Sequence, residues 1–205
     1  EAAIKLARKY GKLHRDGAYE VVSTTESFHG RTLAALAATG QRKYQRYFEP
    51  MPEGFRLVPF NELEAMREAV GERTCAVLME LVQGESGVNP ADPTYVEGVR
   101  KLCDERGVML IFDEVQTGVG RTGHLFAHQT YGVEPDAFTV AKGLAAGLPI
   151  GALLAKERAA VFEPPDHAST FGGNPVGAAA ALATLRIVRE DRFLAGVRET
   201  GAYLR

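Results

Sequence analysis

The chain has 205 residues, of which 45% are hydrophobic and 24% charged, and its formal net charge is −2. This length is sufficient for one full hydrophobic core, and the small net charge gives no reason to expect nucleic acid or an anionic membrane as a partner. No apolar run is long enough to span a bilayer, and no signal-peptide pattern opens the chain. We interpret the two cysteines, Cys75 and Cys103, as free thiols of a reducing, cytoplasmic protein, with no disulfide and no metal site.

The two ends of the sequence both lie in helix-like patterns. The chain begins with Glu1 and Ala2, without an initiator methionine, and it ends at Tyr203, Leu204 and Arg205. Neither end carries a capping or stop signal. We therefore expect the sequence to be a fragment of a longer protein.

Strand-like apolar runs alternate with helical patterns along the chain. Strands are expected at residues 19–24, 56–60, 74–80, 108–112, 137–140 and 150–155, and helices at 31–39, 61–71, 92–107 and 174–189. Asn61 and Glu64 are expected to form an N-cap and N3 pair, and Gly107 is expected just after a helix end. This α/β alternation predicts a mainly parallel sheet that helices cover on both faces.

Asp113 follows the most apolar of the expected strands, at its carboxyl end. Ligands of parallel sheets collect beyond the carboxyl ends of the strands. Asp113 and Glu114 could be a solvated strand end or metal ligands, but no histidine or second acidic pair recurs at metal-ligand spacing. An ionised Asp113 would also suit a pyridine nitrogen, which it would keep protonated.

Lys142 lies in the segment TVAKGLAAGLPIGALLA, which has no other charge between Asp136 and Lys156. Most lysines after a strand are simply solvated. Apolar surroundings would instead disfavour the ammonium form and leave a nucleophilic amine. Such an amine can form an imine with an aldehyde cofactor. Together with the anion at Asp113, it favours pyridoxal phosphate chemistry.

The segment GVGRTG, residues 118–123, matches the pattern GxGxxG of dinucleotide-binding turns. That fingerprint requires the glycines directly after a strand and a helix directly after the glycines. Here DEVQT separates the strand from the glycines, and no acidic residue is placed at the end of a second strand. We therefore reject a nicotinamide-binding role for this segment.

Four further side chains have both a structural and a functional interpretation. The sequence alone favours a core aromatic at Phe28, although its ring could also stack on a flat cofactor. Arg31 could be a surface residue or could bind a substrate carboxylate with its planar guanidinium. Ser169 and Thr170 could be ordinary loop hydroxyls, but hydroxyls beside flexible glycines also suit a phosphate or carboxylate.

Four motifs in order, SFHGRT, FDEVQTGVGRTG, AKGLAAGLPIGA and STFGGNP, resemble those of the class III pyridoxal-phosphate aminotransferases, the ornithine and acetylornithine type. The resemblance extends over essentially all 205 residues. Within the class, AAIKLARKYG, FHGRTLAALAATGQ and VPFNELEAMREAV are most similar to the acetylornithine enzymes of bacterial arginine synthesis. The resemblance implies a transaminase that uses pyridoxal 5'-phosphate.

The resemblance also implies roles for residues around the cofactor. Lys142 matches the lysine that bonds covalently to the cofactor, and Asp113 matches the carboxylate at the pyridine nitrogen. Gln116 matches the amide near the phenolic oxygen, and Phe28 matches the ring stacked on the cofactor. The neighbouring residues Glu114 and Val115 complete the implied cofactor contacts within one subunit.

Further implied roles concern the substrate and a partner subunit. Arg31 matches the arginine that holds the substrate's α-carboxylate, and Ser169 matches a substrate contact. Glu85 matches the glutamate that pairs with a movable arginine to admit either substrate. Thr170 matches the hydroxyl that reaches the cofactor phosphate of the partner subunit in a homodimer. The family's glycine-rich phosphate-binding turn and its second substrate arginine fall outside the sequence.

The resemblance implies a three-layer α/β/α sandwich with a mostly parallel mixed sheet, the large domain of the fold-type I enzymes. Residues 1–190 would form this domain, and residues 191–205 would begin the connection to a small domain. The implied reaction moves the δ-amino group of N2-acetylornithine to 2-oxoglutarate, giving N-acetylglutamate semialdehyde and glutamate. The alternatives are a related transaminase acting on ornithine, 4-aminobutyrate, succinylornithine or carrier-bound lysine, a pyridoxal-phosphate-dependent aminomutase, and a non-catalytic scaffold that retains the fold.

Overall fold

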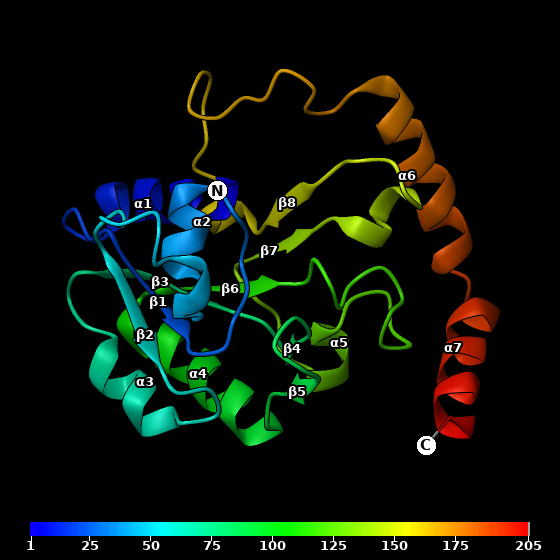
Figure 1. Ribbon diagram of the computed structural model, residues 1–205, viewed down its shortest axis with the longest axis horizontal. Helices are drawn as coiled ribbons and strands as arrows, with labels where there is room; N and C mark the ends of the chain where they lie inside the picture. Colours follow the sequence, from blue (N-terminus) through cyan, green and yellow to red (C-terminus); the bar gives the residue numbers. More distant parts are fainter. Residues whose placement is uncertain (205) are drawn as a thin grey trace.

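A mixed sheet of six strands forms the centre of the computed structural model, which describes residues 1–204 (Figure 1). In spatial order the strands are β2 (Phe55–Val58), β1 (Glu20–Thr24), β3 (Thr74–Met79), β6 (Met109–Asp113), β7 (Ala137–Val140) and β8 (Ala152–Ala155). The first five run parallel, and β8 is antiparallel to β7. The prediction of a mostly parallel mixed sheet is therefore confirmed.

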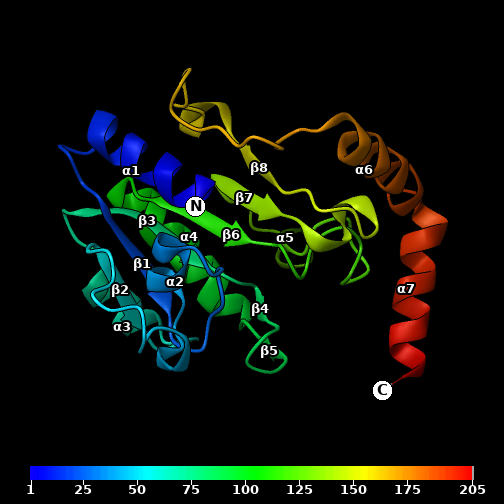
Figure 2. The same cartoon turned by 45° about the horizontal axis from the view of Figure 1, so that its top comes forward.

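Helices cover both faces of the sheet, which gives the predicted three layers (Figure 2). On one face lie α1 (Ala2–His14) and α2 (Leu33–Ala38). On the other face lie α3 (Leu63–Ala69), α4 (Pro93–Arg106) and the short α5 (His128–Tyr131). α4 ends at Gly107, whose φ of 62° provides the left-handed conformation expected after a helix.

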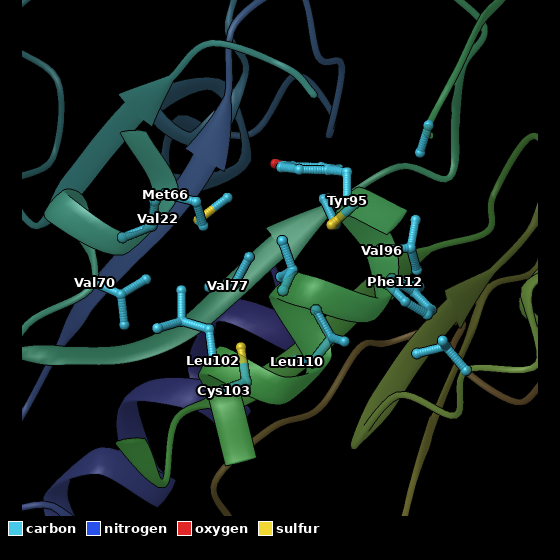
Figure 3. Close-up of a cluster of buried hydrophobic side chains, with 14 of the residues drawn as sticks. Val22, Met66, Val70, Val77, Tyr95, Val96, Leu102, Cys103, Leu110 and Phe112 are labelled. Carbon is cyan, nitrogen blue, oxygen red and sulfur yellow. The ribbon is translucent and has the colours of Figure 1, made fainter. Parts of the chain in front are cut away.

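Two hydrophobic cores result from the alternation of side chains along the central strands. The residues of β3 and β6 are all buried, as in parallel strands that are covered on both faces. One core, between the sheet and α3–α4, includes Val77, Met79, Leu110 and Phe112 (Figure 3). The other, beneath α1, includes Ala76, Leu78, Met109 and Ile111.

The last two helices lie beside the sheet (Figure 1). α6 (Pro175–Val188) begins after Asn174, whose side chain accepts a hydrogen bond from the Gly177 amide at 2.7 Å. Ala181 of α6 packs against the 3₁₀ turn η2 (Lys142–Ala145). α7 (Asp191–Tyr203) has no buried residue within the described part of the chain. The predicted domain boundary after residue 190 falls between these helices and stays a prediction.

The remaining elements are short. β4 (Val82–Gln83) and β5 (Asn89–Pro90) form an antiparallel hairpin, and η1 (Arg42–Tyr44) and η3 (Glu157–Ala159) are 3₁₀ turns. The predicted cap of α3 is wrong, because the N-cap residue is Glu62. Asn61 instead accepts a hydrogen bond from the Asp92 amide at 2.9 Å, and so ties α3 to the start of α4. No helix within residues 1–204 combines the length and apolarity needed to cross a membrane.

Candidate active site

Asp113 ends β6 at the carboxyl edge of the sheet and is 8% exposed. Its Oδ1 accepts hydrogen bonds from the Val115 amide at 3.1 Å and from the Thr139 hydroxyl at 3.2 Å. Its Oδ2 lies 2.8 Å from Nδ1 of His29. Three donors from three segments therefore fix the orientation of this carboxylate.

His29 is one of the residues at this site that the sequence does not mark as functional candidates. Its side chain is 2% exposed, and its backbone amide donates to the Thr39 hydroxyl at 2.9 Å. An ionised carboxylate only accepts hydrogen bonds, so Nδ1 of His29 carries a proton when Asp113 is ionised. Nε2 is buried and has no hydrogen-bond partner among residues 1–204. A buried nitrogen without a partner calls for an explanation, and a bound ligand would supply one.

Glu80 is a second buried acid that the sequence analysis did not select. It lies just beyond β3 and is 3% exposed. Its Oε2 accepts a hydrogen bond from the Phe28 amide at 2.9 Å, which fixes the loop that carries Phe28 and His29. Burial raises the pKa of Glu80 to about 7, and the positive charge that His29 can carry opposes this increase. Glu80 is therefore a carboxyl group that titrates near neutral pH beneath the site.

Glu114 points away from Asp113, because successive side chains of a strand face opposite sides. Its carboxylate accepts hydrogen bonds from the Ala127 amide at 2.6 Å and the His128 amide at 3.0 Å, and Oε1 lies 2.7 Å from Nδ1 of His128. This carboxylate therefore anchors α5 and does not reach the cavity at Asp113. Within the described residues, no group of three or more His, Cys, Asp or Glu side chains is placed to hold a metal ion.

Two hollows lie at this edge of the sheet, and Val115 lines both. One, of about 310 Å³, is lined by His29, Asp113 and the first residues of α1. The other, of about 650 Å³, is lined by Lys142 and Gln116. The Gln116 amide group lies against Gly84, where an added Cβ would come within 3.2 Å of it. Asp113 and Lys142 thus line two hollows that share Val115 as a lining residue.

Lys142 follows β7, the strand that pairs with β6, which ends at Asp113. Thr139, three residues earlier, is the register partner of Asp113. The expected apolar enclosure of Lys142 is wrong, because Lys142 is exposed in the described structure. The apolar residues Leu144 and Ala145 turn instead toward α6. Lys142 has a φ of 43°, a left-handed conformation that is uncommon outside glycine and that often marks a functional turn.

Phe28, Arg31 and Glu85 belong to a cluster on the loops next to Asp113. The Arg31 guanidinium lies 5.4 Å from the centre of the Phe28 ring and 4.1 Å from that of Tyr44. The Tyr44 hydroxyl donates to Oε1 of Glu85, and Gln41 donates to Oε2 at 2.6 Å. These hydrogen bonds, that of Tyr44 first, lower the pKa of Glu85. The structure therefore brings together one ring, one cation and one anion that the sequence analysis had selected separately.

Ser169 and Thr170 lie elsewhere. Both are exposed, on the long segment that runs from β8 to α6 across the top of Figure 1. Neither residue lines the hollows at Asp113 or Lys142. The structure thus leaves them outside the site that this chain forms.

The turn 118–123, with the rejected GxGxxG match, packs on the last two helices. A Cβ on Gly120 would lie 2.6 Å from Cγ1 of Val188, and one on Gly123 would lie 2.5 Å from Cγ of Arg198. Arg198 also donates a hydrogen bond to the Gly123 carbonyl. The glycines therefore allow close helix packing, which is a structural role.

All residues from 1 to 205 match the family model described as "Aminotransferase class-III". The chain belongs to the class III aminotransferases. Among members of the class, it is 55% identical to the acetylornithine aminotransferase of Caldanaerobacter subterraneus subsp. tengcongensis, over 100% of this chain and 52% of that protein. It is 50% identical to the succinylornithine transaminase of Photorhabdus laumondii subsp. laumondii, over 99% and 51%.

The fold of this class III chain also matches a solved structure, the ornithine aminotransferase of Toxoplasma gondii, with a TM-score of 0.95 and 33% identity. That match covers 100% of this chain and 50% of the other. The chain therefore spans about half the length of the relatives it matches. The family and fold that the four motifs implied are confirmed.

Proposed function

We propose that the chain is the cofactor-binding part of a transaminase that moves the δ-amino group of N2-acetylornithine to 2-oxoglutarate. The products would be N-acetylglutamate semialdehyde and glutamate, as in arginine biosynthesis. The reaction class is supported by one observation: Asp113 is a buried carboxylate held in a fixed orientation on β6, and the neighbouring strand β7 leads to Lys142. The choice of amino donor rests on the 55% identical relative that is named for acetylornithine.

The residues present fit pyridoxal 5'-phosphate. Asp113 faces a cavity of about 310 Å³, a size that suits one small heterocycle, and the orphaned His29 Nε2 lies beside it. The first residues of α1 line the same cavity. When bound, pyridoxal phosphate supplies an aldehyde carbon and a protonated ring that accepts electrons from the substrate.

Each side chain would then have a defined task. Asp113 would hold a proton on the ring nitrogen, with His29, Thr139 and the Val115 amide keeping its oxygens in place. The Lys142 amine would hold the cofactor at its aldehyde carbon, with the aldehyde oxygen leaving as water, and once displaced by the substrate amine it would carry a proton between the amine-bearing carbon of the substrate and that cofactor carbon. Phe28 would offer a flat face to the ring, and Gln116 a hydrogen bond to the phenolic oxygen. Arg31 would bind a substrate carboxylate.

The proposal includes a homodimer located in the cytoplasm. Ser169 and Thr170 are exposed and lie outside this chain's own hollows, which leaves them available to the site of a partner subunit. Cys75 and Cys103 are both free and buried. Burial raises the pKa of each thiol to about 12, which suits thiols that stay reduced in a reducing compartment.

The decisive experiment is the variant Lys142→Ala in the full-length enzyme. We expect it to lose the visible absorption band of covalently bound cofactor and the sensitivity of that band to borohydride, because Lys142 is the one lysine among residues 1–204 that lines either hollow. Lys156→Ala is the matched control, since Lys156 lies on the surface and pairs with Glu134 at 3.0 Å. Survival of the band in Lys142→Ala would refute the assignment.

A panel of amino donors, each assayed with the same keto acid acceptor, tests the substrate. Acetylornithine should give the highest specificity constant of the panel. Succinylornithine is the second candidate, because a relative that is 50% identical is a succinylornithine transaminase. A higher specificity constant for succinylornithine, ornithine or 4-aminobutyrate would show that the preferred donor is wrong.

A further inference from the structure

Tyr44 contacts all three members of the loop cluster, although it is not among the residues that the four motifs supply. Its ring packs edge-on against Phe28, with centroids 5.9 Å apart and an interplanar angle of 84°. The face of the ring holds the Arg31 guanidinium at 4.1 Å. Its hydroxyl donates a hydrogen bond to Oε1 of Glu85. One side chain thus connects the ring, the cation and the anion of the cluster.

The segment that carries Tyr44 is fixed on both sides. Gln41, which is 5% exposed, donates to the Ser27 carbonyl at 3.2 Å as well as to Glu85. Gln45 donates to the carbonyls of Leu36 and Thr39, both at 2.9 Å, at the end of α2. These contacts hold the 3₁₀ turn η1 against the loop that contains Phe28 and Arg31. The position of Tyr44 is therefore set by the fold and does not depend on a bound substrate.

Arg31 and Glu85 carry opposite charges in this cluster but form no ion pair with each other within residues 1–204. Arg31 lowers the pKa of Glu85 only through space, whereas Tyr44 and Gln41 lower it by direct hydrogen bonds. Tyr44 lies between the two groups, with its ring on Arg31 and its hydroxyl on Glu85. Stacking on the ring face leaves the N–H groups of the guanidinium free at its rim.

We propose that Tyr44 is a positioning residue that keeps Arg31 open to a substrate carboxylate by holding Glu85 away from it. This inference rests on the proposed function, because it takes Arg31 as the carboxylate-binding group. An exposed arginine without such a restraint would pair with the nearest carboxylate, and the substrate would then have to displace that partner. The hydroxyl of Tyr44 supplies Glu85 with an alternative partner, and its ring supports the guanidinium.

The test uses the holoenzyme and glutarate, a five-carbon dicarboxylate with no amino or keto group, so that binding occurs without reaction. Tyr44→Phe retains the ring and removes the hydrogen bond to Glu85. We expect the Kd of glutarate, measured by calorimetry, to rise about fivefold or more. The KM for the keto acid acceptor should rise with it, while kcat and the absorption band of the cofactor stay near their wild-type values.

A double-mutant cycle separates this mechanism from a general loosening of the loop. In a Glu85→Gln background the competing anion is gone, so Tyr44→Phe should leave the Kd of glutarate unchanged. Tyr47→Phe is the matched control, because Tyr47 lies on the next turn, is 76% exposed, and contacts Arg46. It should leave the Kd unchanged in both backgrounds.

An unchanged Kd in Tyr44→Phe would overturn the inference, and so would an equal weakening in the presence and absence of Glu85. If Arg31→Ala did not weaken glutarate binding, the inference would also fail, because Arg31 would not be the carboxylate site. The proposed function is tested by a different experiment, and it fails if the Lys142→Ala variant keeps the absorption band of covalently bound cofactor. With that band lost as expected, an unchanged Kd in Tyr44→Phe refutes the role of Tyr44 alone.

Discussion

Both carboxylate oxygens of Asp113 are already engaged by the protein. His29 contacts one oxygen, and Thr139 and the Val115 amide contact the other. A carboxylate held in this way loses little conformational freedom when a ligand binds, which increases affinity through preorganisation. Asp113 also lines the cavity of about 310 Å³.

His29 variants test this preorganisation. His29→Leu removes the hydrogen bond to Asp113, and we expect the affinity for pyridoxal phosphate to fall by about tenfold or more, the effect of losing a hydrogen bond to a charged group. His29→Asn should recover most of the affinity, because its amide nitrogen replaces Nδ1. Equilibrium binding of the cofactor to the apoenzyme measures both.

The matched control is His14→Leu, which changes an exposed histidine in the last turn of α1. It should bind the cofactor like the wild type. If His29→Leu and His29→Asn weakened binding equally, the hydrogen bond would not be the cause, and packing around the ring would explain the loss.

The sequence predicts some of these residues and not others for identifiable reasons. Asp113 is predictable because a long apolar strand and its carboxyl end are local features. His29 is not, because its partner Asp113 lies 84 residues away. The enclosure of Lys142 was wrongly expected, because the apolar residues that follow it in sequence pack on α6 and do not surround its side chain.

The turn 118–123 joins the sheet to the last two helices and is under conformational constraint. Val119 has a φ of 57°, which is unusual for a β-branched residue, and Gly120 has a φ of 84°. The missing side chain of Gly120 leaves room for Val188 of α6. A side chain at position 120 would therefore push this turn and α6 apart.

Gly120→Ala tests the close approach. We expect a loss of about 2 kcal/mol or more in the free energy of unfolding, because the variant combines an unfavourable φ with a clash against Val188. Gly132→Ala is the matched control, since Gly132 also has a positive φ, of 64°, but has no neighbour within 4 Å of an added Cβ. Urea denaturation measures both. Equal losses would show that backbone strain alone, and not packing on α6, is responsible.

Helices and strands are likewise predictable where nearby residues determine them, and not where distant contacts do. β3 and β6 are predictable from their apolar runs, and α6 from Asn174 and Pro175 at its start. The antiparallel direction of β8 cannot be predicted from the residues of this strand, because a four-residue apolar run suits either direction. The cap at Asn61 was predicted wrongly because the side chain bonds to Asp92, a residue 31 positions away.

For the molecule as a whole, the ionisation of Glu80 beneath the site makes the free energy of unfolding depend on pH. Its pKa in the folded state, about 7, lies above the ordinary value of 4.5, so the folded state binds this proton more tightly than the unfolded state. The stability that results is fully present below about pH 4.5 and is lost as the pH rises through 7. At neutral pH and above, this buried carboxylate therefore destabilises the fold.

Glu80→Gln should remove that pH dependence. The amide oxygen can still accept the hydrogen bond from Phe28, but the side chain cannot ionise. We expect the variant to gain stability relative to the wild type by up to about 1 kcal/mol per pH unit between roughly pH 5 and 7. Urea denaturation of the apoprotein over this range measures the difference. Glu68→Gln, an exposed change in α3, is the control, and a wild-type-like slope in Glu80→Gln would contradict the assignment.

The packing of η2 on α6 has a mechanical consequence. Leu144 and Ala145 of the turn that bears Lys142 form one hydrophobic cluster with Ala181 and Leu185 of α6. Rigid contacts of this kind transmit displacement instead of absorbing it. A tilt of α6 would therefore move the backbone of Lys142, and with it the reach of its amine.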